Sequence, residues 1–201
     1  MTLSLKEQFG EIDIYLFDQI LRGNLHPDMR VLDAGCGRGR NLVYLLRAGC
    51  DVYGVDADPA AVDHVRRLAA KLGVESAPEH FVAAPIESMP FPDGFADAVI
   101  CSAVLHFAHS EDRFRSMLAD MWRVLRTGGL FFCRLGSRIG MDFEPIEGGL
   151  HRLPDGTKWF LVDEPLLLKL TEELGGELVD PLKTTIVQGK RCMTTWVLRK
   201  R

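Results

Sequence analysis

The feature that most constrains this chain is the run VLDAGCGRGRN at residues 31–41, where a short apolar stretch leads into an acid and alternating glycines. Glycine lets the backbone turn sharply and approach a ligand at places where a Cβ atom would clash. Leu42, Leu45, Leu46 and Gly49 follow at the spacing of one helix face, so the run predicts a strand, a loop and a helix N-terminus. The unpaired amides of that terminus favour a polar ligand group at the loop.

Other interpretations of the loop fit less well or stay open. The dinucleotide pattern G-x-G-x-x-G needs a third glycine where Arg40 stands, although Gly39 lies beside it. The phosphate-binding pattern G-x-x-x-x-G-K-[ST] fails, because neither Lys-Ser nor Lys-Thr follows the glycines. An ordinary tight turn between a strand and a helix remains an alternative when the loop is taken alone.

A second strand pattern ends in an acid. Residues 51–56 read DVYGVD, and Asp56 lies about twenty residues beyond Gly35, the usual distance for a carboxylate that accepts hydrogen bonds from both ribose hydroxyls. Asp58 precedes Pro59 and a helical pattern, so we expect it to cap that helix and leave it out of the site.

These segments resemble class I S-adenosylmethionine-dependent methyltransferases. Residues 33–39 match the family's first motif, D-x-G-x-G-x-G, at every fixed position. Residues 81–107, FVAAPIESMPFPDGFADAVICSAVLHF, are similar to the motifs that hold the adenine and methionine portions of the cofactor. The resemblance covers residues 29–198 and implies S-adenosylmethionine as cofactor and S-adenosylhomocysteine as product. The string GRN at residues 39–41, followed by Tyr44-Leu45, narrows the resemblance toward tellurite-resistance and small-molecule-detoxifying methyltransferases.

The resemblance also implies site residues. Many relatives have an acid that accepts from the adenine amino group where this chain has Pro85, so that bond is absent unless Glu87 replaces it; Glu87 fits an exposed loop position equally well. Asp33 is expected to orient the loop or to hold the amino group of the cofactor. The expected cofactor site comprises Asp33, Gly35, Cys36, Gly37, Gly39, Asn41, Asp56, Ala57, Pro85, Ile86, Ser102 and Ala103.

Strand and helix patterns alternate from residue 29 onward, which is typical of an α/β protein whose parallel sheet is covered on both faces. Further strands are expected at residues 79–83, 96–101 and 130–135, and a hairpin is expected around residues 188–190. We predict a Rossmann-like, doubly wound, mostly parallel sheet of seven strands. The resemblance implies the strand order 3-2-1-4-5-7-6, with the last strand antiparallel.

Composition limits the partners. The 201 residues suit a single domain, with a helical segment over residues 1–28. A net charge of −4, with a concentrated basic run only at residues 199–201, disfavours a nucleic acid partner. Five scattered cysteines indicate a reducing cytoplasm, and early charged residues leave neither a signal peptide nor a membrane span. We expect a cytoplasmic monomer or homodimer without a membrane partner.

Methyl transfer depends mainly on positioning, so a catalytic base is optional. His106, after the fourth strand, is the candidate catalytic base, and an imidazole that caps the next helix is the alternative. His106, His109, Glu111 and Asp112 form an incomplete and local ligand set, so we expect no metal.

Residues 136–162 form a long irregular segment. Long irregular segments within compact domains usually have a function. We interpret it as a substrate lid with Arg138, His151 and Trp159 as candidate substrate residues. The turn signal at residues 154–157 predicts a small hairpin in its second half. A dimerisation arm or a plain cover for the sheet edge is the alternative.

Together these patterns indicate a methyltransferase that uses S-adenosylmethionine to methylate a small-molecule acceptor. A non-catalytic cofactor-binding regulatory or assembly protein is an alternative, because no catalytic residue is obligatory. An NAD-dependent oxidoreductase is a further alternative, because Asp56 would serve either cofactor.

Overall fold

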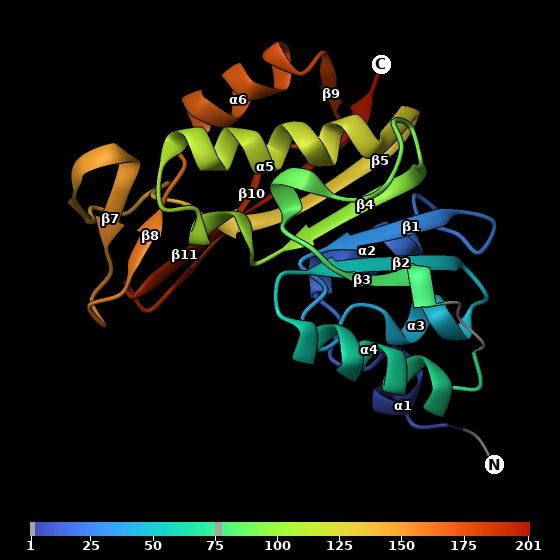
Figure 1. The fold of residues 1–201 in the computed structure, drawn as a ribbon. Helices are drawn as coiled ribbons and strands as arrows, with labels where there is room; N and C mark the ends of the chain where they lie inside the picture. Colours follow the sequence, from blue (N-terminus) through green and yellow to red (C-terminus); the bar gives the residue numbers. More distant parts are fainter. Residues whose placement is uncertain (1–2, 75–77) are drawn as a thin grey trace.

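A computed structural model of the chain describes residues 3–74 and 78–201 and places most of its strands in one central sheet (Figure 1). These strands are β1 (Arg30–Ala34), β2 (Asp51–Asp56), β3 (Phe81–Ala83), β4 (Ala96–Ser102), β5 (Leu125–Gly136), β9 (Gly176–Leu178), β10 (Lys183–Val187) and β11 (Arg191–Lys200). Their order is β3-β2-β1-β4-β5-β11-β10, and β9 also pairs with β11. Strands β1 to β5 are mutually parallel and β11 runs antiparallel to β5, so the predicted order and reversed strand are confirmed.

Two details of the sheet differ from the prediction. Strand β9 adds a short eighth strand at the end of β11, and a run of three residues is too short to show the alternation that predicts strands. The third strand begins at Phe81 rather than at residue 79, because the short 3₁₀ helix η1 (Pro78–His80) precedes it.

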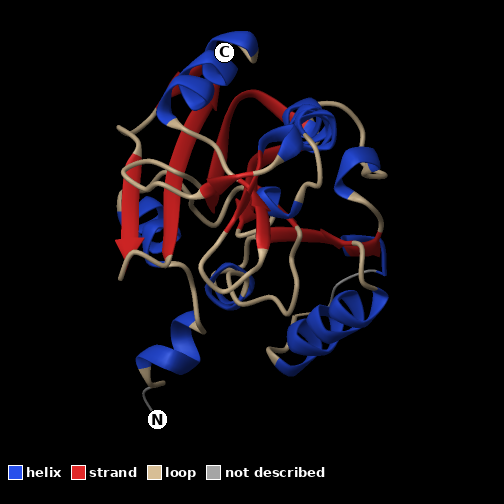
Figure 2. Ribbon diagram, turned by 90° about the vertical axis from the view of Figure 1, so that its left-hand side faces the viewer, coloured by secondary structure: helices blue, strands red, loops and turns tan. Residues whose placement is uncertain are grey.

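Helices cover both faces of the sheet (Figures 1 and 2). The helices are α1 (Leu5–Phe9), α2 (Ile14–Leu21), α3 (Val43–Arg47), α4 (Pro59–Lys71), α5 (Glu111–Val124) and α6 (Glu164–Glu173). Successive strand residues point to opposite faces, so Val31 packs on the side of α2, α3 and α4, whereas Leu32 packs on the side of α5 and α6. This burial on two faces explains the continuous apolar runs of the strands. Within the described residues, no helix has the length and apolarity to cross a membrane.

Polar side chains fix where the helices begin. Asp58 Oδ1 accepts a hydrogen bond from the amide of Ala60 at 2.9 Å, which confirms Asp58 as the cap of α4. Ser110 caps α5 in the same way through the amide of Arg113.

The N-terminal segment forms two helices rather than one. Helices α1 and α2 are separated by residues 10–13, and the fully buried Leu16 anchors α2 in the core. This arrangement brings the start of α2 close to the carboxyl ends of the central strands.

The segment over residues 136–162 leaves the carboxyl end of β5 and forms a small sheet of its own. Strands β7 (Leu150–Arg152) and β8 (Lys158–Phe160) pair antiparallel around the predicted turn, which confirms the small hairpin. Strand β6 (Glu144–Pro145) adds a third strand that the sequence pattern did not indicate.

Candidate functional site

The glycine loop after β1 is held by the neighbouring strand β2. The amides of Gly35 and Cys36 donate to the carbonyl of Val55 at 2.8 and 2.9 Å. The amide of Gly37 donates to Asp56 Oδ2 at 2.8 Å, and Asp56 Oδ1 accepts from the amide of Asp58 at 2.9 Å. Asp56 therefore fixes the loop and the entry to α4 with one carboxylate.

Two glycines of the loop are required for different reasons. A Cβ atom on Gly35 would lie 2.5 Å from a methyl carbon of Val104, so a side chain there would push the loop off the end of β4. Gly37 has φ of +51° and a Cβ atom there would meet no atom within 4 Å, so it would project into open space. Gly37 is thus the point at which the backbone itself faces the site.

A cavity of about 620 Å³ lies where the sheet reverses its order, between β1 and β4. In doubly wound sheets, ligands bind outside the carboxyl ends of the strands at this switch point. The cavity is lined by Glu11, Gly35, Cys36, Gly37, Arg38, Arg40, Asn41, Asp56, Ala57, Pro85, Ile86, Glu87, Ser102, Ala103, Val104, Phe107, Arg113 and Met117. Its volume is in the usual range for small-molecule and cofactor sites.

The structure brings ten of the twelve predicted cofactor residues to this cavity and places Asp33 and Gly39 outside its lining. Gly39 packs against α4, where a Cβ atom would lie 2.9 Å from a methyl carbon of Leu68. Asp33 lies at the end of β1 and is 2% exposed. Burial raises the pKa of Asp33 to about 7, Arg40 opposes this rise and Asp56 adds to it. The hydrogen bonds that orient the loop go to Val55 and Asp56 instead.

One end of the cavity lies beside β2 and β3. The loop after β3 supplies Pro85, Ile86 and Glu87, and Ile86 begins the 3₁₀ helix η2 (Ile86–Ser88). Glu87 Oε1 lies 3.2 Å from a guanidinium nitrogen of Arg113. Glu87 Oε2 is buried and has no hydrogen-bond partner among the described residues, so this carboxylate is available to a donor in the cavity.

The other end of the cavity lies beside β4 and β5. Arg40 Nη2 donates to Ser102 Oγ at 2.9 Å and lies 3.8 Å from Asp13 Oδ2. The amide of Asp13 donates to Asn41 Oδ1 at 3.0 Å. The start of α2 is therefore joined to the glycine loop at the cavity wall.

His106 does not line the cavity. It lies in the 3₁₀ helix η3 (Leu105–Phe107), and its Nδ1 accepts a hydrogen bond from the amide of Gly136 at 3.2 Å. Its ring lies 4.0 Å from the ring of Trp159, and burial, assisted by Arg191, lowers its pKa to about 4. The alternative role, a cap of the next helix, is wrong because Ser110 caps α5.

The three predicted substrate residues also lie outside the cavity lining. Arg138 forms an ion pair with Asp163 at the start of α6, and His151 Nδ1 lies 3.1 Å from the carbonyl of Gly149. Trp159 lies near the cavity, because its ring centroid is 6.1 Å from that of Phe107, which lines it. Residues 136–162 thus adjoin the cavity wall at Trp159.

Several residues at the cavity were not predicted from the sequence as site residues. Glu11 comes from the N-terminal segment, Arg113 and Met117 come from α5, and Phe107 is a 63% exposed aromatic residue at the cavity wall. Phe107 lies six positions beyond the predicted strand end at residue 101, and its exposure is seen only in the structure. No local pattern marks Glu11 or Arg113.

Known proteins share sequence with this chain. A methyltransferase domain family matches residues 32–133. A fatty-acid O-methyltransferase of Mycolicibacterium smegmatis is 35% identical over 156 residues, which are 77% of this chain and 54% of that protein. A malonyl-[acyl-carrier protein] O-methyltransferase of Serratia marcescens is 28% identical over 134 residues, 64% of this chain and 49% of that protein. The chain spans about half the length of the curated relatives it matches.

A solved structure shares the fold. The 1,6-didemethyltoxoflavin-N1-methyltransferase of Burkholderia thailandensis, crystallised with 1,6-didemethyltoxoflavin and S-adenosylhomocysteine, superposes with a TM-score of 0.69. The match covers 96% of this chain and 79% of that chain at 24% identity, so it shows the fold alone.

Proposed function

The chain belongs to the methyltransferase domain family of the class I S-adenosylmethionine-dependent methyltransferases, and from this premise we propose that it methylates a small-molecule acceptor. The observation that carries the proposal is the cavity at the switch point of the sheet, which joins the glycine loop, Asp56 and the end of β4. Its remaining wall supplies apolar groups from Val104, Phe107 and Met117 for an acceptor.

The residues present fit an S-adenosyl group. The open space above Gly37 admits a ligand against the backbone. Each carboxylate oxygen of Asp56 accepts one backbone hydrogen bond and has a further lone pair for a ribose hydroxyl. The unpartnered Glu87 Oε2 is available to the adenine amino group, which compensates for Pro85 at the position where relatives have an acid. We propose all three contacts as binding contacts.

Bound S-adenosylmethionine would supply an electrophilic methyl group to a nucleophile of the acceptor, with the neutral thioether S-adenosylhomocysteine as the leaving group. The residues of this chain act by positioning, which can supply about 7–11 kcal/mol of barrier reduction. The loop and Asp56 hold the nucleoside, and the apolar wall excludes water from the acceptor. The proposal assigns no reaction step to His106, because its Nδ1 is occupied by Gly136 and it lies outside the lining.

The names of the relatives support a small acceptor. The two curated relatives are named for a fatty acid and for malonyl-[acyl-carrier protein], and the superposed structure holds 1,6-didemethyltoxoflavin. The fatty acid and 1,6-didemethyltoxoflavin are small molecules, and we propose an acceptor of this size rather than a nucleic acid. The cytoplasmic location, the single domain over residues 1–201 and the tellurite-resistance branch stay predictions.

Two measurements test the proposal. Calorimetry with S-adenosylhomocysteine measures cofactor binding, for which we expect saturable binding at one site. Transfer of labelled methyl groups is then measured with fatty acids, hydroxylated heteroaromatic compounds and thiols as acceptors. Binding with turnover supports the proposal, binding without turnover on any acceptor favours a non-catalytic cofactor-binding protein, and absence of binding contradicts both.

A further inference from the structure

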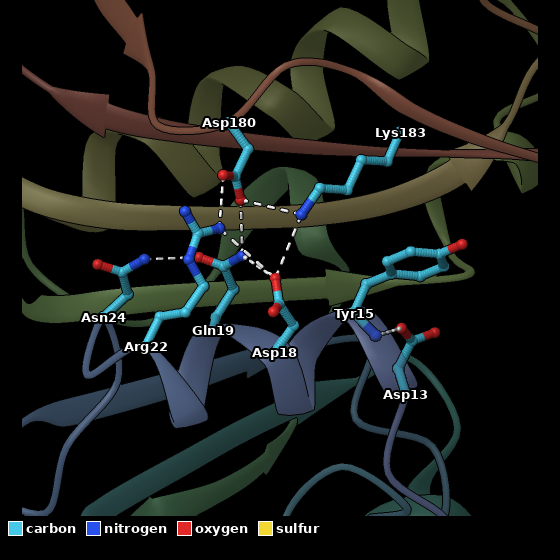
Figure 3. Close-up of polar contacts among 8 residues, drawn as sticks. All are labelled: Asp13, Tyr15, Asp18, Gln19, Arg22, Asn24, Asp180 and Lys183. Carbon is cyan, nitrogen blue, oxygen red and sulfur yellow. Dashed lines mark hydrogen bonds and ion pairs between the residues drawn. The ribbon is translucent and has the colours of Figure 1, made fainter.

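Charged side chains hold helix α2 at both of its ends, and Figure 3 shows Asp13 against Tyr15 at its start and Asp180 against Gln19 and Arg22 at its end. At its N-terminus, Asp13 Oδ1 accepts from the amide of Tyr15 at 3.0 Å and Asp13 Oδ2 accepts from Arg134 Nη1 at 3.1 Å. At its C-terminus, Asp180 accepts from Arg22 at 2.5 Å and from Gln19 at 2.8 Å. Two carboxylates therefore hold the same helix to the C-terminal half of the chain.

Of these two carboxylates, Asp13 lies beside a residue that lines the cavity. Asp13, whose side chain is 3% exposed, lies 3.8 Å from Arg40 Nη2, and this nitrogen also donates to Ser102 Oγ. Arg40 and Ser102 both line the cavity, whereas Asp180 and its partners do not. Asp13 and Asp180 are thus alike in holding α2 and differ in their contact with a cavity residue.

The topology indicates what Arg40 would meet. Asp56 ends β2 and Ile86 follows β3, so a nucleoside on these residues lies on one side of β1. Ser102 ends β4, on the other side of β1, and Arg40 is held against it. A cofactor whose ribose bound Asp56 and which crossed the end of β1 would therefore bring its amino-acid end toward Arg40.

Arg40 also has guanidinium N–H donors that no residue of the described chain uses. Its contacts within the described residues are made by Nη2 alone, which leaves Nε and Nη1 without a protein acceptor. A guanidinium binds a carboxylate through two parallel hydrogen bonds when its orientation is fixed. The Arg40 side chain is 45% exposed, so a free side chain would sample many rotamers, and the contacts with Asp13 and Ser102 limit them.

We propose that Asp13 is a positioning residue that acts through Arg40, which binds the carboxylate at the amino-acid end of the cofactor. The inference rests on the proposed function, since it needs the cofactor to be S-adenosylmethionine. It deepens that proposal by coupling the N-terminal segment to recognition of one chemical group. The alternative is that Arg40 binds a carboxylate of the acceptor instead of the carboxylate of the cofactor.

The test compares S-adenosylmethionine with decarboxylated S-adenosylmethionine, which has the same nucleoside and sulfonium but lacks the carboxylate. Calorimetry without acceptor gives the ratio of the two affinities for each variant. We expect the full chain to prefer S-adenosylmethionine, and we expect Asp13→Asn and Arg40→Gln each to lower this ratio by about tenfold through loss of a charge-assisted contact. Asp180→Asn is the matched control, because it weakens the docking of α2 without touching Arg40, and it should keep the ratio.

The outcomes separate the inference from its alternatives. Equal loss of the ratio in Asp13→Asn and Asp180→Asn would show that docking of α2 is what matters and would overturn a positioning role. An unchanged ratio in Asp13→Asn also overturns it. If Asp13→Asn does not fold, an unchanged ratio in Arg40→Gln, at a half-exposed side chain, overturns the inference in its place. A carboxylate on the acceptor predicts unchanged ratios in every variant but weaker acceptor binding. Absence of binding by the unmodified chain refutes the proposed function itself.

Discussion

Asp56 combines two tasks in one side chain. Its carboxylate holds the glycine loop through Gly37 and the start of α4 through Asp58, and it lines the cavity at the same time. The backbone contacts leave one lone pair on each oxygen, directed to hydroxyl donors. Asp56 therefore affects both the conformation of the glycine loop and the affinity of the cavity for a ligand.

Replacing Asp56 by Ala is expected to weaken binding of S-adenosylhomocysteine strongly. Each hydrogen bond to a charged acceptor contributes about 1.5–3 kcal/mol, and two are lost together with the support of the loop. Asp56→Asn keeps the shape and one acceptor oxygen and should be milder. Calorimetry on the folded variants measures both effects, and an unchanged affinity in Asp56→Ala would refute the ribose contact.

The raised pKa of Asp33 predicts that cofactor binding depends on pH. Burial raises the pKa of Asp33 to about 7, so the carboxyl is protonated below that pH. If Asp33 holds the amino group of the cofactor, binding requires the ionised form, and affinity should increase as the pH rises from about 6 to about 8. Each pH unit below the pKa should weaken binding by up to about tenfold.

Asp33→Asn cannot ionise and should show a flat profile over the same pH range. Calorimetry at several pH values with S-adenosylhomocysteine decides the question. A profile that keeps its slope in Asp33→Asn would assign the titration to another group.

At the scale of elements, the structure joins η3, β5 and β8 through one imidazole. His106 accepts from the amide of Gly136 in β5, its ring lies tilted against the ring of Trp159 of β8, and it is 2% exposed. Burial lowers its pKa to about 4, so the ring stays neutral in the folded protein at neutral pH. The contact fixes the strand end from which residues 136–162 depart.

His106 should therefore make stability depend on pH. Its folded pKa of about 4 lies below the ordinary value of 6.5, so between these values the unfolded chain takes up a proton that the folded chain does not. The free energy of unfolding should fall as the pH falls through this window, by up to about 3 kcal/mol. His106→Gln keeps an acceptor for Gly136 but does not titrate, so it should lose this dependence.

Urea denaturation at about pH 7 and about pH 5 measures the difference between the two proteins. The raised pKa of Asp33 makes the free energy of unfolding change with pH in the opposite direction. Because this contribution is the same in the unmodified chain and in His106→Gln, it cancels in the difference. If His106→Gln instead abolishes methyl transfer while stability at each pH is unchanged, His106 is a catalytic residue.

The sequence predicted those elements whose patterns are local. The strands β1 to β5, the cap at Asp58 and the hairpin at residues 154–157 follow from strand patterns, capping chemistry and turn residues within short windows, whereas the strand order was implied by the family resemblance. Strand β9 was missed because it is too short to show a period.

For the candidate site, too, the sequence predicted the residues that lie in local motifs and missed the long-range contacts. The motif residues of the loop and of the strand ends meet at one cavity, and their binding roles stay predictions. The contact between Asp13 and Arg134 joins residues 121 positions apart, and no local pattern contains it. The bulky groups of residues 136–162 make Trp159 a candidate substrate residue in the sequence, and only the packing shows that its ring lies against His106.

At the scale of the whole molecule, stability and function draw on different aromatic residues. Phe132 in β5 is fully buried in the core between the sheet and helices α2, α3 and α4, whereas Phe107 is 63% exposed at the cavity wall. The two side chains are chemically identical, so they form a matched pair for truncation.

Phe132→Ala should lower the free energy of unfolding by about 3–5 kcal/mol through loss of burial and formation of a void. Phe107→Ala should lower it by less than about 1 kcal/mol and should instead weaken acceptor binding. Urea denaturation and acceptor titration measure the two effects. A large loss of stability in Phe107→Ala would show that this ring is part of the core rather than of the site.

The contacts of α2 also constrain how the chain is made. Its partners Arg134, Asp180 and Lys183 all follow it by more than a hundred positions. On the ribosome, where a chain emerges at about 5–20 residues per second, α2 therefore emerges well before the residues that hold it. These contacts of α2, and the part of the cavity wall that depends on them, can form only after residue 183 has been synthesised.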